Sequence, residues 1–355
     1  MKILYLTKYT RKGASSRLRS FQYFTFLRSS GVKIDTSPLF NEQYLNALYN
    51  NKNNKIWILL NCYFNRFLVL FSVRKYDLLV IEKELFPYLP AFFENLFFIF
   101  KINYVIDIDD AIFHNYDLNK NKFIRFFLKN KINKVMKLSS LVVVCNRYLF
   151  NKAKKFGAKR VEIIPTVIDI QKYTKQNKDL NKNDFTIGWI GSPTTIFYLK
   201  TISSALKEMV NKYDVNIHII GAKSNIGFFK NVKYIEWSEE SEVTEILKFD
   251  VGIMPLNDSK WEKGKCSYKI IQYMACKKPV IASPIGMNNT VITNNFNGFL
   301  AKTHDEWLEY LELYFLNSNL RKKHGINGFN LVEEKYCIQK TSLKLLNLLE
   351  SVLEK

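Results

Sequence analysis

The sequence has 355 residues, of which 47% are hydrophobic, and its formal net charge is +21. This length exceeds what one hydrophobic core usually organises, so we expect two domains. The hydrophobic fraction and the lack of a long low-complexity tract exclude an intrinsically disordered chain. Five cysteines stand without paired or metal-ligand spacing, which favours a reducing compartment over a disulfide framework.

The first residues are too few and too quickly polar to form a signal peptide, and 3–7 are typical of a first strand. We therefore expect a cytoplasmic protein. Residues 56–73 and 85–100 are rich in Phe, Leu and Ile, but charged residues and prolines interrupt them. Neither segment supplies the ~20 consecutive apolar residues that a membrane-spanning helix needs.

The positive charge is concentrated in one half of the chain. Residues 1–180 hold 31 Lys and Arg against 13 Asp and Glu, a net of +18, whereas the remainder holds 53 − 31 = 22 against 32 − 13 = 19, a net of +3. Nucleic acid, an anionic membrane or a generally basic proteome each explain such an excess. The chain has no recognisable nucleic-acid reading motif, so the asymmetry favours peripheral contact with the inner face of a membrane.

Residues 121–138 mix apolar side chains with lysines and one arginine, a pattern that predicts one basic amphipathic helix. Such a helix binds anionic lipid at about 1 kcal/mol per well-placed cation. An ordinary surface helix with its apolar stripe in the core explains the segment equally well.

Short apolar runs alternate with helical patterns along the whole chain. Helices are predicted over 17–29, ending at Gly31, and over 147–156, ending at Gly157. Strand-then-helix alternation with buried-looking strands predicts an α/β fold with parallel sheets. The strand-like runs include 3–7, 78–81, 104–106, 141–144, 185–190, 216–220, 251–254 and 280–282.

The pattern restarts after a polar stretch at 171–184, which we interpret as a linker. We expect an N-terminal domain over 1–170 and a C-terminal domain over 184–335, each a doubly wound, Rossmann-like sheet, facing each other across a cleft. Ligands collect at the carboxyl ends of strands in such sheets. The leucine-rich segment 336–353 predicts a last helix, which we expect to rejoin the N-terminal domain.

The densest chemical signal lies in residues 250–286. They predict a strand, a basic loop, a helix, a second strand and a turn at Gly286. Ser267 is the expected N-cap of that helix, and Lys265 and Lys269 flank its first turn. Free amides, the helix dipole and two ammonium groups would then converge on a diphosphate. A solvated basic turn explains the same spacing.

Two further loops follow strands in the manner of phosphate or sugar sites. The strand over 186–190 leads into Gly191 and Ser192, where Ser and Thr residues and a proline mark a helix start. Gly13, Ser16 and Arg17 belong to a small, basic loop after the first strand. That loop matches neither the Walker pattern nor G-x-G-x-x-G, so neither an ATPase nor a dinucleotide enzyme is supported.

An acidic run, Asp-Ile-Asp-Asp at 107–110, follows the strand at 104–106. Its carboxylates Asp109 and Asp110 are candidates to hold a divalent metal or to bind sugar hydroxyls and act as a base. Asp-x-Asp is common by chance and no other ligand cluster accompanies it, so we expect no metal. His114 stands alone, which favours a structural or merely exposed role.

Taken jointly, these motifs resemble the family 4 glycosyltransferases of the GT-B class. The resemblance is carried by 2–17, 104–113, 142–146, 163–169, 188–192 and the 250–286 block. It implies two Rossmann-like domains, of which the C-terminal one holds a nucleotide sugar. It also implies retention of anomeric configuration, no bound metal or other cofactor, and a leaving diphosphate that helps to deprotonate the acceptor.

The chain departs from the family at the two glutamates that usually stand seven residues apart. Gly264 falls at the first position and Gln272 at the second, where its amide would bind the ribose hydroxyls. Glu262 would replace the sugar contact of the first glutamate. Asp109 or Asp110 would contact the sugar or acceptor where the family often has a histidine.

The family's phosphate-binding Arg/Lys pair is also missing, at 192–195. Its role would pass to Lys265 and Lys269, with the glycine loops completing the donor site. The expected partners are a nucleotide-sugar donor, a saccharide or lipid-linked acceptor of bacterial surface polysaccharide synthesis, and an anionic membrane, but no nucleic acid. A nucleotide-sugar epimerase of the same architecture, which needs no acceptor, is the alternative enzyme, and a basic nucleic-acid-binding protein is the alternative of another class.

Overall fold

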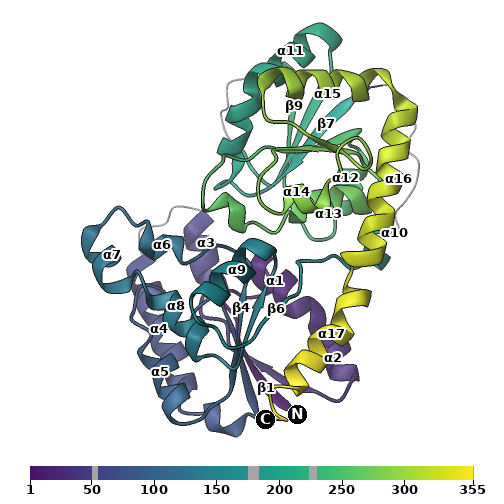
Figure 1. Cartoon of the computed structure of the whole chain (residues 1–355). Helices are drawn as coiled ribbons and strands as arrows, with labels where there is room; N and C mark the ends of the chain where they lie inside the picture. Colours follow the sequence, from purple (N-terminus) through teal and green to yellow (C-terminus); the bar gives the residue numbers. More distant parts are fainter. Residues whose placement is uncertain (50–54, 175–183, 224–229, 355) are drawn as a thin grey trace. The chain divides into compact units, whose positions relative to one another are not determined.

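The computed structural model describes residues 1–49, 55–174, 184–223 and 230–354. The chain forms two compact units (Figure 1). Unit 1 comprises Met1–Thr166, Gly264–Cys266 and Lys340–Lys355, and unit 2 comprises Val167–Lys263 and Ser267–Gln339. The expected linker at 171–184 overlaps α10 (Ile170–Thr174) of unit 2, and its residues 175–183 lie outside the described part of the chain.

Unit 1 is built on a parallel six-stranded sheet with the order β2-β1-β3-β4-β5-β6. Its central strands β3, β4 and β5 are buried at every position, because helices cover both faces. The strands are β1 (Lys2–Leu6), β2 (Lys33–Thr36), β3 (Leu78–Glu82), β4 (Tyr104–Ile108), β5 (Leu141–Val144) and β6 (Val161–Ile163).

The C-terminal helix α17 (Ile338–Glu350) covers the unit 1 sheet on the same side as α1 (Ala14–Arg19) and α2 (Phe24–Ser29), while α4 (Lys55–Leu70), α5 (Phe92–Ile99) and α8 (Lys131–Leu138) lie on the other side (Figure 1). The Tyr23 hydroxyl lies 3.0 Å from Thr341 Oγ1, which ties α17 to unit 1. The expected return of the last helix is therefore confirmed. The other helices of unit 1 are α3 (Glu42–Tyr49), α6 (His114–Asp117), α7 (Lys122–Leu128) and α9 (Arg147–Lys155), with short 3-10 turns at Phe21–Tyr23 and Val73–Lys75.

Unit 2 repeats this architecture with the strand order β12-β11-β10-β7-β8-β9. Its strands are β7 (Thr186–Ile190), β8 (Asn216–Ile220), β9 (Val232–Ile235), β10 (Val251–Met254), β11 (Val280–Ala282) and β12 (Phe299–Leu300). Its helices are α10, α11 (Ser203–Tyr213), α12 (Glu242–Leu247), α13 (Tyr268–Ala275), α14 (Asn288–Val291), α15 (His304–Leu316) and α16 (Ser318–Lys335), with 3-10 turns at Ile196–Ile202 and Glu262–Gly264. The predicted fold class, two doubly wound α/β domains with parallel sheets, is confirmed.

Two predicted helices differ from the structure. The segment 17–29 is broken by a 3-10 turn into α1 and α2, although Gly31 does adopt the left-handed φ (+84°) expected of a helix stop. The segment 121–138 forms two helices, α7 and α8, rather than one. The apolar stripe of α8 is buried, whereas Phe123, Phe126 and Phe127 of α7 are exposed. The prediction of one continuous helix over 121–138 is therefore wrong. Within the described residues, no helix combines the length and apolarity needed to cross a membrane.

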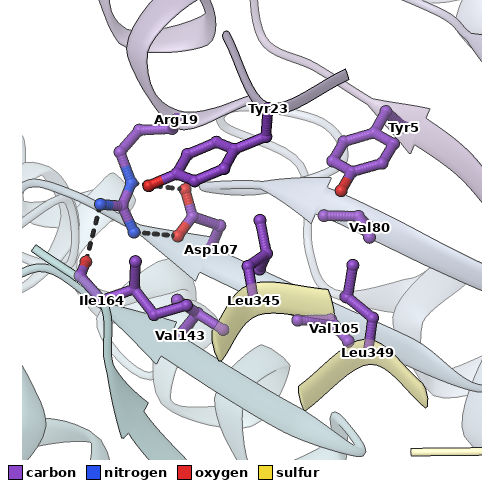
Figure 2. A pocket seen from close by; sticks show the side chains of 10 residues that line it. All are labelled: Tyr5, Arg19, Tyr23, Val80, Val105, Asp107, Val143, Ile164, Leu345 and Leu349. Carbon is purple, nitrogen blue, oxygen red and sulfur yellow. Dashed lines mark hydrogen bonds and ion pairs between the residues drawn. The ribbon is translucent and has the colours of Figure 1, made fainter. Parts of the chain in front are cut away.

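A buried ion pair lies between the unit 1 sheet and α17, inside a cavity lined mainly by valines, leucines and tyrosines (Figure 2). The Arg19 guanidinium donates through Nε and Nη2 to both carboxylate oxygens of Asp107, at 2.9 and 2.5 Å, and through Nη1 to the carbonyl oxygen of Ile164 at 2.8 Å. Asp107 belongs to β4, because that strand runs on to Ile108. The first member of the acidic run is therefore a core residue that fastens α1 to the sheet.

Replacing Arg19 with Ala would leave the Asp107 carboxylate buried without its counter-charge. We expect Arg19→Ala to lower the free energy of unfolding by about 3–5 kcal/mol, measured by urea denaturation. The double variant R19M/D107L removes both charges and should recover most of this loss. A double variant as unstable as the single one would show that the pair is not the cause.

Candidate functional site

Polar side chains gather where each sheet reverses its strand order. The reversal lies between β1 and β3 in unit 1 and between β7 and β10 in unit 2. In doubly wound sheets, ligands bind at the carboxyl ends of the strands at this reversal, because the two loops there diverge to opposite faces. We therefore examined these two points, each within its own unit.

In unit 2 the side chain of Tyr273 occupies the reversal. Strands β7 and β10 are paired over only two residues each. Beyond them, the Tyr273 hydroxyl accepts the backbone N–H of Ile190 at 3.0 Å and donates to the carbonyl oxygen of Ile253 at 3.3 Å. A Cβ on Gly252 would lie 2.3 Å from the tyrosine ring, so only glycine leaves room for it. These contacts fix α13 at the carboxyl ends of both strands.

The first turn of α13 begins without a side-chain cap among the described residues. Ser267 occupies the predicted N-cap position, but its backbone is left-handed (φ +53°) and its hydroxyl donates to Asn288 Oδ1 at 2.7 Å. The predicted capping role of Ser267 is thus wrong, because Asn288 engages the hydroxyl instead. The Ser267 side chain therefore does not cap α13, and the helix dipole adds positive potential at this end of the helix.

Lys269 and Gly191 lie together at this helix start. The Lys269 ammonium is 4.2 Å from the ring centroid of Trp189. A Cβ on Gly191 would lie 2.4 Å from that ring and 2.8 Å from Lys269 Nζ. Glycine at 191 therefore permits the lysine and the tryptophan to approach the loop that follows β7.

Ser192 lies in that loop, and its hydroxyl is 2.8 Å from Thr194 Oγ1. The loop leads into a 3-10 helix at Ile196–Ile202 that Thr195 precedes without capping it. The predicted capped helix start at 192–195 is therefore wrong, since these hydroxyls interact with one another instead.

Two other predicted donor-site residues of unit 2 have hydrogen-bond partners within the protein, and a third is a glycine in a left-handed turn. The buried Glu262 carboxylate accepts hydrogen bonds from the Tyr198 hydroxyl, at 2.5 Å, and from Ser259. The amide nitrogen of Gln272 donates to the Tyr173 hydroxyl at 3.4 Å. Gly286 has a φ of +56°, and a Cβ there would lie 2.8 Å from the Lys263 carbonyl oxygen, which explains the need for glycine.

Lys265 belongs to unit 1, although the expected C-terminal domain included it. The side-chain amide of Asn146 donates to the carbonyl oxygens of Gly264 and Lys265 at 2.9 and 3.1 Å, and the Cys266 thiol donates to the Asp109 carbonyl oxygen at 2.7 Å. These three residues therefore pack with the carboxyl ends of the unit 1 strands. Lys265 and Lys269 lie in different units.

In unit 1 the buried carboxylate of Glu82 organises the loop after β1. Ser16 donates its hydroxyl to Glu82 at 2.5 Å and accepts the backbone N–H of Tyr9 at 2.9 Å. The Ser15 hydroxyl lies 2.9 Å from Glu82 and 2.6 Å from Asp109. Gly13 is required because a Cβ there would lie 2.4 Å from the Tyr9 side chain. The loop is thus held to the ends of β3 and β4.

Arg17 is buried on α1, one residue beyond this serine pair. Unlike Arg19, it does not line the cavity of Figure 2.

Lys83 is the central cation of the unit 1 cluster, and the sequence interpretation missed it. Its backbone is left-handed (φ +64°), and its ammonium lies 2.8 Å from Asp109 Oδ1 and 3.2 Å from Asp110 Oδ2. Such a backbone is unfavourable for a non-glycine residue and persists only where other contacts fix it. A sequence signal exists: Glu82, Lys83 and Glu84 alternate in charge directly after an apolar strand.

Burial and ion pairing act in opposite directions on these groups. Burial would raise the pKa of Asp109, but the Lys83 ammonium and the Ser15 hydroxyl more than offset this and hold it below its ordinary value. Burial raises the pKa of Glu82, which has no cation as close. The side chain of Asp110 is 30% exposed. Of the two predicted carboxylates, Asp110 is therefore the one that solvent reaches.

His114 has both ring nitrogens occupied, at 2.7 Å from Asp117 Oδ1 and 2.9 Å from the Tyr148 hydroxyl. It is buried, so its role is structural. Among the residues that the structure describes, no group of three or more His, Cys, Asp or Glu side chains is placed to hold a metal ion.

Comparison with known proteins agrees with this geometry. Residues 185–312 match the family model described as glycosyl transferases group 1. The chain therefore carries a glycosyltransferase domain. It is also 23% identical over 242 residues to an uncharacterized glycosyltransferase of Methanocaldococcus jannaschii, a match that covers 62% of this chain and 61% of that protein. The matched part is thus about three-fifths of the length of that relative.

Solved structures share the fold of this chain. Sucrose-phosphate synthase from Thermosynechococcus elongatus superposes with a TM-score of 0.73 at 11% identity, covering 100% of this chain and 99% of that one. HepE from Anabaena in complex with UDP-glucose gives 0.71 at 16% identity, covering 99% and 100%. TarM from S. aureus in complex with UDP and saccharide ligands gives 0.59 at 17% identity, covering 80% and 59%. The chain has the GT-B fold.

Removing the Tyr273 hydroxyl tests how α13 is held. Tyr273→Phe leaves the ring in place but deprives a buried N–H and a buried carbonyl of their partner. We expect the free energy of unfolding to fall by about 1–3 kcal/mol in denaturant titration. Tyr310→Phe is the matched control, because that ring stacks on Phe299 at the far end of the sheet order. Equal effects of the two substitutions would contradict this assignment.

Asp109 and Asp110 should differ in what they contribute to stability. We expect Asp109→Asn to cost about 3 kcal/mol of unfolding free energy, since it deprives the buried Lys83 of its nearest charge, and Asp110→Asn to cost less than about 1 kcal/mol because it is partly solvated. The pKa of Asp109 is lowered from 3.8, so its contribution is fully present above that pH. Denaturation curves should show a difference in unfolding free energy between wild type and Asp109→Asn that is constant from about pH 5 to 8 and shrinks below about pH 4. A gap that widens towards acid pH would contradict the ion pair.

Proposed function

We propose that this protein is a retaining, family 4 type glycosyltransferase that moves a sugar from a UDP-sugar to a saccharide or lipid-linked acceptor in bacterial surface polysaccharide synthesis. The observation that carries the proposal is the start of α13: the positive end of this helix, the Lys269 ammonium and Gly191 lie together at the strand-order reversal in the segment that matches the glycosyltransferase model. This is the arrangement that a diphosphate requires.

The donor is assigned from chemistry and from similar proteins. The diphosphate carries two to three negative charges, and the helix dipole with one ammonium group offsets part of them in a partly buried position. HepE was solved with UDP-glucose and TarM with UDP, which supports uridine as the base. Gln272 follows one helical turn after Lys269 on α13 and is the candidate for the ribose hydroxyls.

Unit 1 would supply the acceptor side. Asp110 is the partly exposed carboxylate of its cluster, and the Lys83 ammonium, 3.2 Å from Asp110 Oδ2, fixes its position. A carboxylate held in this way orients sugar hydroxyls and lowers the entropic cost of the transfer step. In the retaining mechanism proposed here, the leaving diphosphate takes the acceptor proton, so the protein mainly orients groups and neutralises charge. We propose that no metal takes part, because Lys269 and the α13 amides serve the diphosphate.

Nucleotide binding tests the donor assignment directly. The wild-type protein should bind UDP more tightly than GDP or CMP in isothermal titration calorimetry without metal and with EDTA present. Lys269→Ala should weaken UDP binding roughly ten- to hundredfold, since a charge-assisted contact contributes about 1.5–3 kcal/mol. Lys322→Ala is the control, because it removes the same charge from an exposed position on α16.

Two outcomes would contradict the proposal. Equal UDP affinity in Lys269→Ala and Lys322→Ala would remove the diphosphate site from α13. Conversion of a UDP-sugar to its epimer without any acceptor, followed by proton NMR, would assign the epimerase alternative. The same NMR assay reports retention, because the first sugar released by slow donor hydrolysis keeps the anomeric configuration of the donor only in a retaining enzyme.

The proposed location is the cytoplasm, with peripheral contact at the inner membrane face. The basic N-terminal half supports this, since residues 1–180 carry a net +18 from 31 Lys and Arg against 13 Asp and Glu. Such a charge draws a protein towards anionic lipid over a distance of about 8 Å at physiological salt.

A further inference from the structure

Unit 1 exposes a large apolar surface along α4 and α5. Trp57, Phe64 and Phe71 on or directly after α4 are 73%, 58% and 75% exposed. Phe92 at the start of α5 is 60% exposed, and Ile99 and Phe100 at its end are 63% and 56% exposed. Single exposed apolar residues are ordinary on protein surfaces, but a continuous set of this size marks a binding surface. We name these six residues the α4–α5 face.

The two helices form one surface rather than two separate patches. Phe67 of α4 and Phe93 of α5 contact each other with ring centroids 5.9 Å apart, and Phe93 contacts Phe92 at 5.3 Å. Figure 1 shows α4 and α5 on the side of the unit 1 sheet opposite α17. Aromatic rings therefore continue from one helix to the next across that flank.

Cations lie at the border of this face. Between Glu42 and Asp77 the sequence contains no acidic residue, and the single acid of α5, Glu94, is buried. At the end of α5, the Arg74 guanidinium lies 5.3 Å from the Phe100 ring, and the Lys159 ammonium lies 5.6 Å from the Phe98 ring. Exposed aromatic rings with cations at their border match the interfacial layer of an anionic membrane.

A second copy of the chain fits this face less well than lipid. Two copies joined through it would bring Arg74 and Lys159 of each border towards the same cations of the other copy, and like charges brought together without counter-charges are destabilising. Anionic lipid satisfies the apolar centre and the basic border at once.

We propose that the α4–α5 face inserts its aromatic side chains into the headgroup region of an anionic lipid bilayer. In the segment 121–138, which the sequence suggested for this contact, α8 packs in the core, whereas α7 exposes Phe123, Phe126 and Phe127. Only the role of this membrane contact rests on the proposed function, since the contact would bring unit 1 to a lipid-linked acceptor. Tyr88 and Leu89, 54% and 44% exposed, add two apolar side chains in the loop after β3, a few residues from Lys83.

Vesicle binding tests the proposal independently of catalysis. The full-length protein is sedimented with phosphatidylcholine vesicles that contain either no anionic lipid or about one-third phosphatidylglycerol. We expect binding to the anionic vesicles only. The double variant W57S/F71S should lower the partition coefficient at least about tenfold, since each buried aromatic contributes roughly 1.5–3 kcal/mol. Arg74→Glu should also weaken binding and make it less sensitive to salt.

The matched control is L316S/I326S, which removes two exposed apolar side chains from unit 2, 71% and 51% exposed. It should bind vesicles like the wild type. Equal losses in both double variants, or binding of W57S/F71S like the wild type, would overturn the proposal. Loss of dimers in W57S/F71S by light scattering, with no vesicle binding by the wild type, would instead assign the face to a second copy.

Nucleotide affinity separates this inference from the proposed function. W57S/F71S should bind UDP like the wild type, which also shows that it is folded. A wild-type protein that binds vesicles but no nucleotide would overturn the donor assignment and leave the α4–α5 face standing. A protein that binds UDP but neither kind of vesicle would overturn the membrane assignment alone.

Discussion

The arrangement of unit 2 depends on the side chain of Tyr273, which lies between the carboxyl ends of β7 and β10. Strands β7 and β10 must separate for a ligand to approach the end of the sheet, yet separated strands leave backbone groups without partners. The Tyr273 hydroxyl supplies a partner to a backbone group of each strand, because it accepts the N–H of Ile190 and donates to the carbonyl oxygen of Ile253. Because the same side chain anchors α13, the first turn of that helix, with Lys269, is fixed where the strands diverge. Tyr273 therefore both separates the two strands and fixes the position of the Lys269 ammonium.

At the strand-order reversal of unit 1, charged side chains rather than one neutral hydroxyl hold the loops in place. At its reversal, the serine hydroxyls of α1 contact Glu82 and Asp109 at the ends of β3 and β4, and Lys83 completes the cluster from a left-handed backbone. A buried network of this kind is stable only when every member is satisfied. The partly exposed Asp110 is its one connection to solvent among the carboxylates described here.

The sequence predicted the inner strands of both sheets and none of the edges. The eight apolar runs correspond to β1, β3, β4, β5, β7, β8, β10 and β11, whereas β2, β6, β9 and β12 are the four edge strands. An edge strand is solvated along one side, so it needs no continuous apolar run, and β2 has a single buried residue. The hydrogen-bond partners of side chains could not be predicted. Ser267 pairs with Asn288, 21 positions away, and Glu262 pairs with Tyr198, 64 positions away, and local sequence patterns do not encode such distant pairs.

Burial also changes what the net charge of unit 1 means. Three of its acids are in ion pairs inside the unit: Asp107 with Arg19, Asp109 with Lys83, and Glu84 with Lys131. Each pair removes one positive and one negative charge, so the net charge of the half-chain is unaltered while the acids withdraw from the surface. The exposed layer is therefore more uniformly basic than the sequence composition suggests. A flank that combines this layer with exposed aromatic rings favours lipid over water, and one of the pairs that create it, Asp109 with Lys83, also belongs to the cluster at the strand-order reversal.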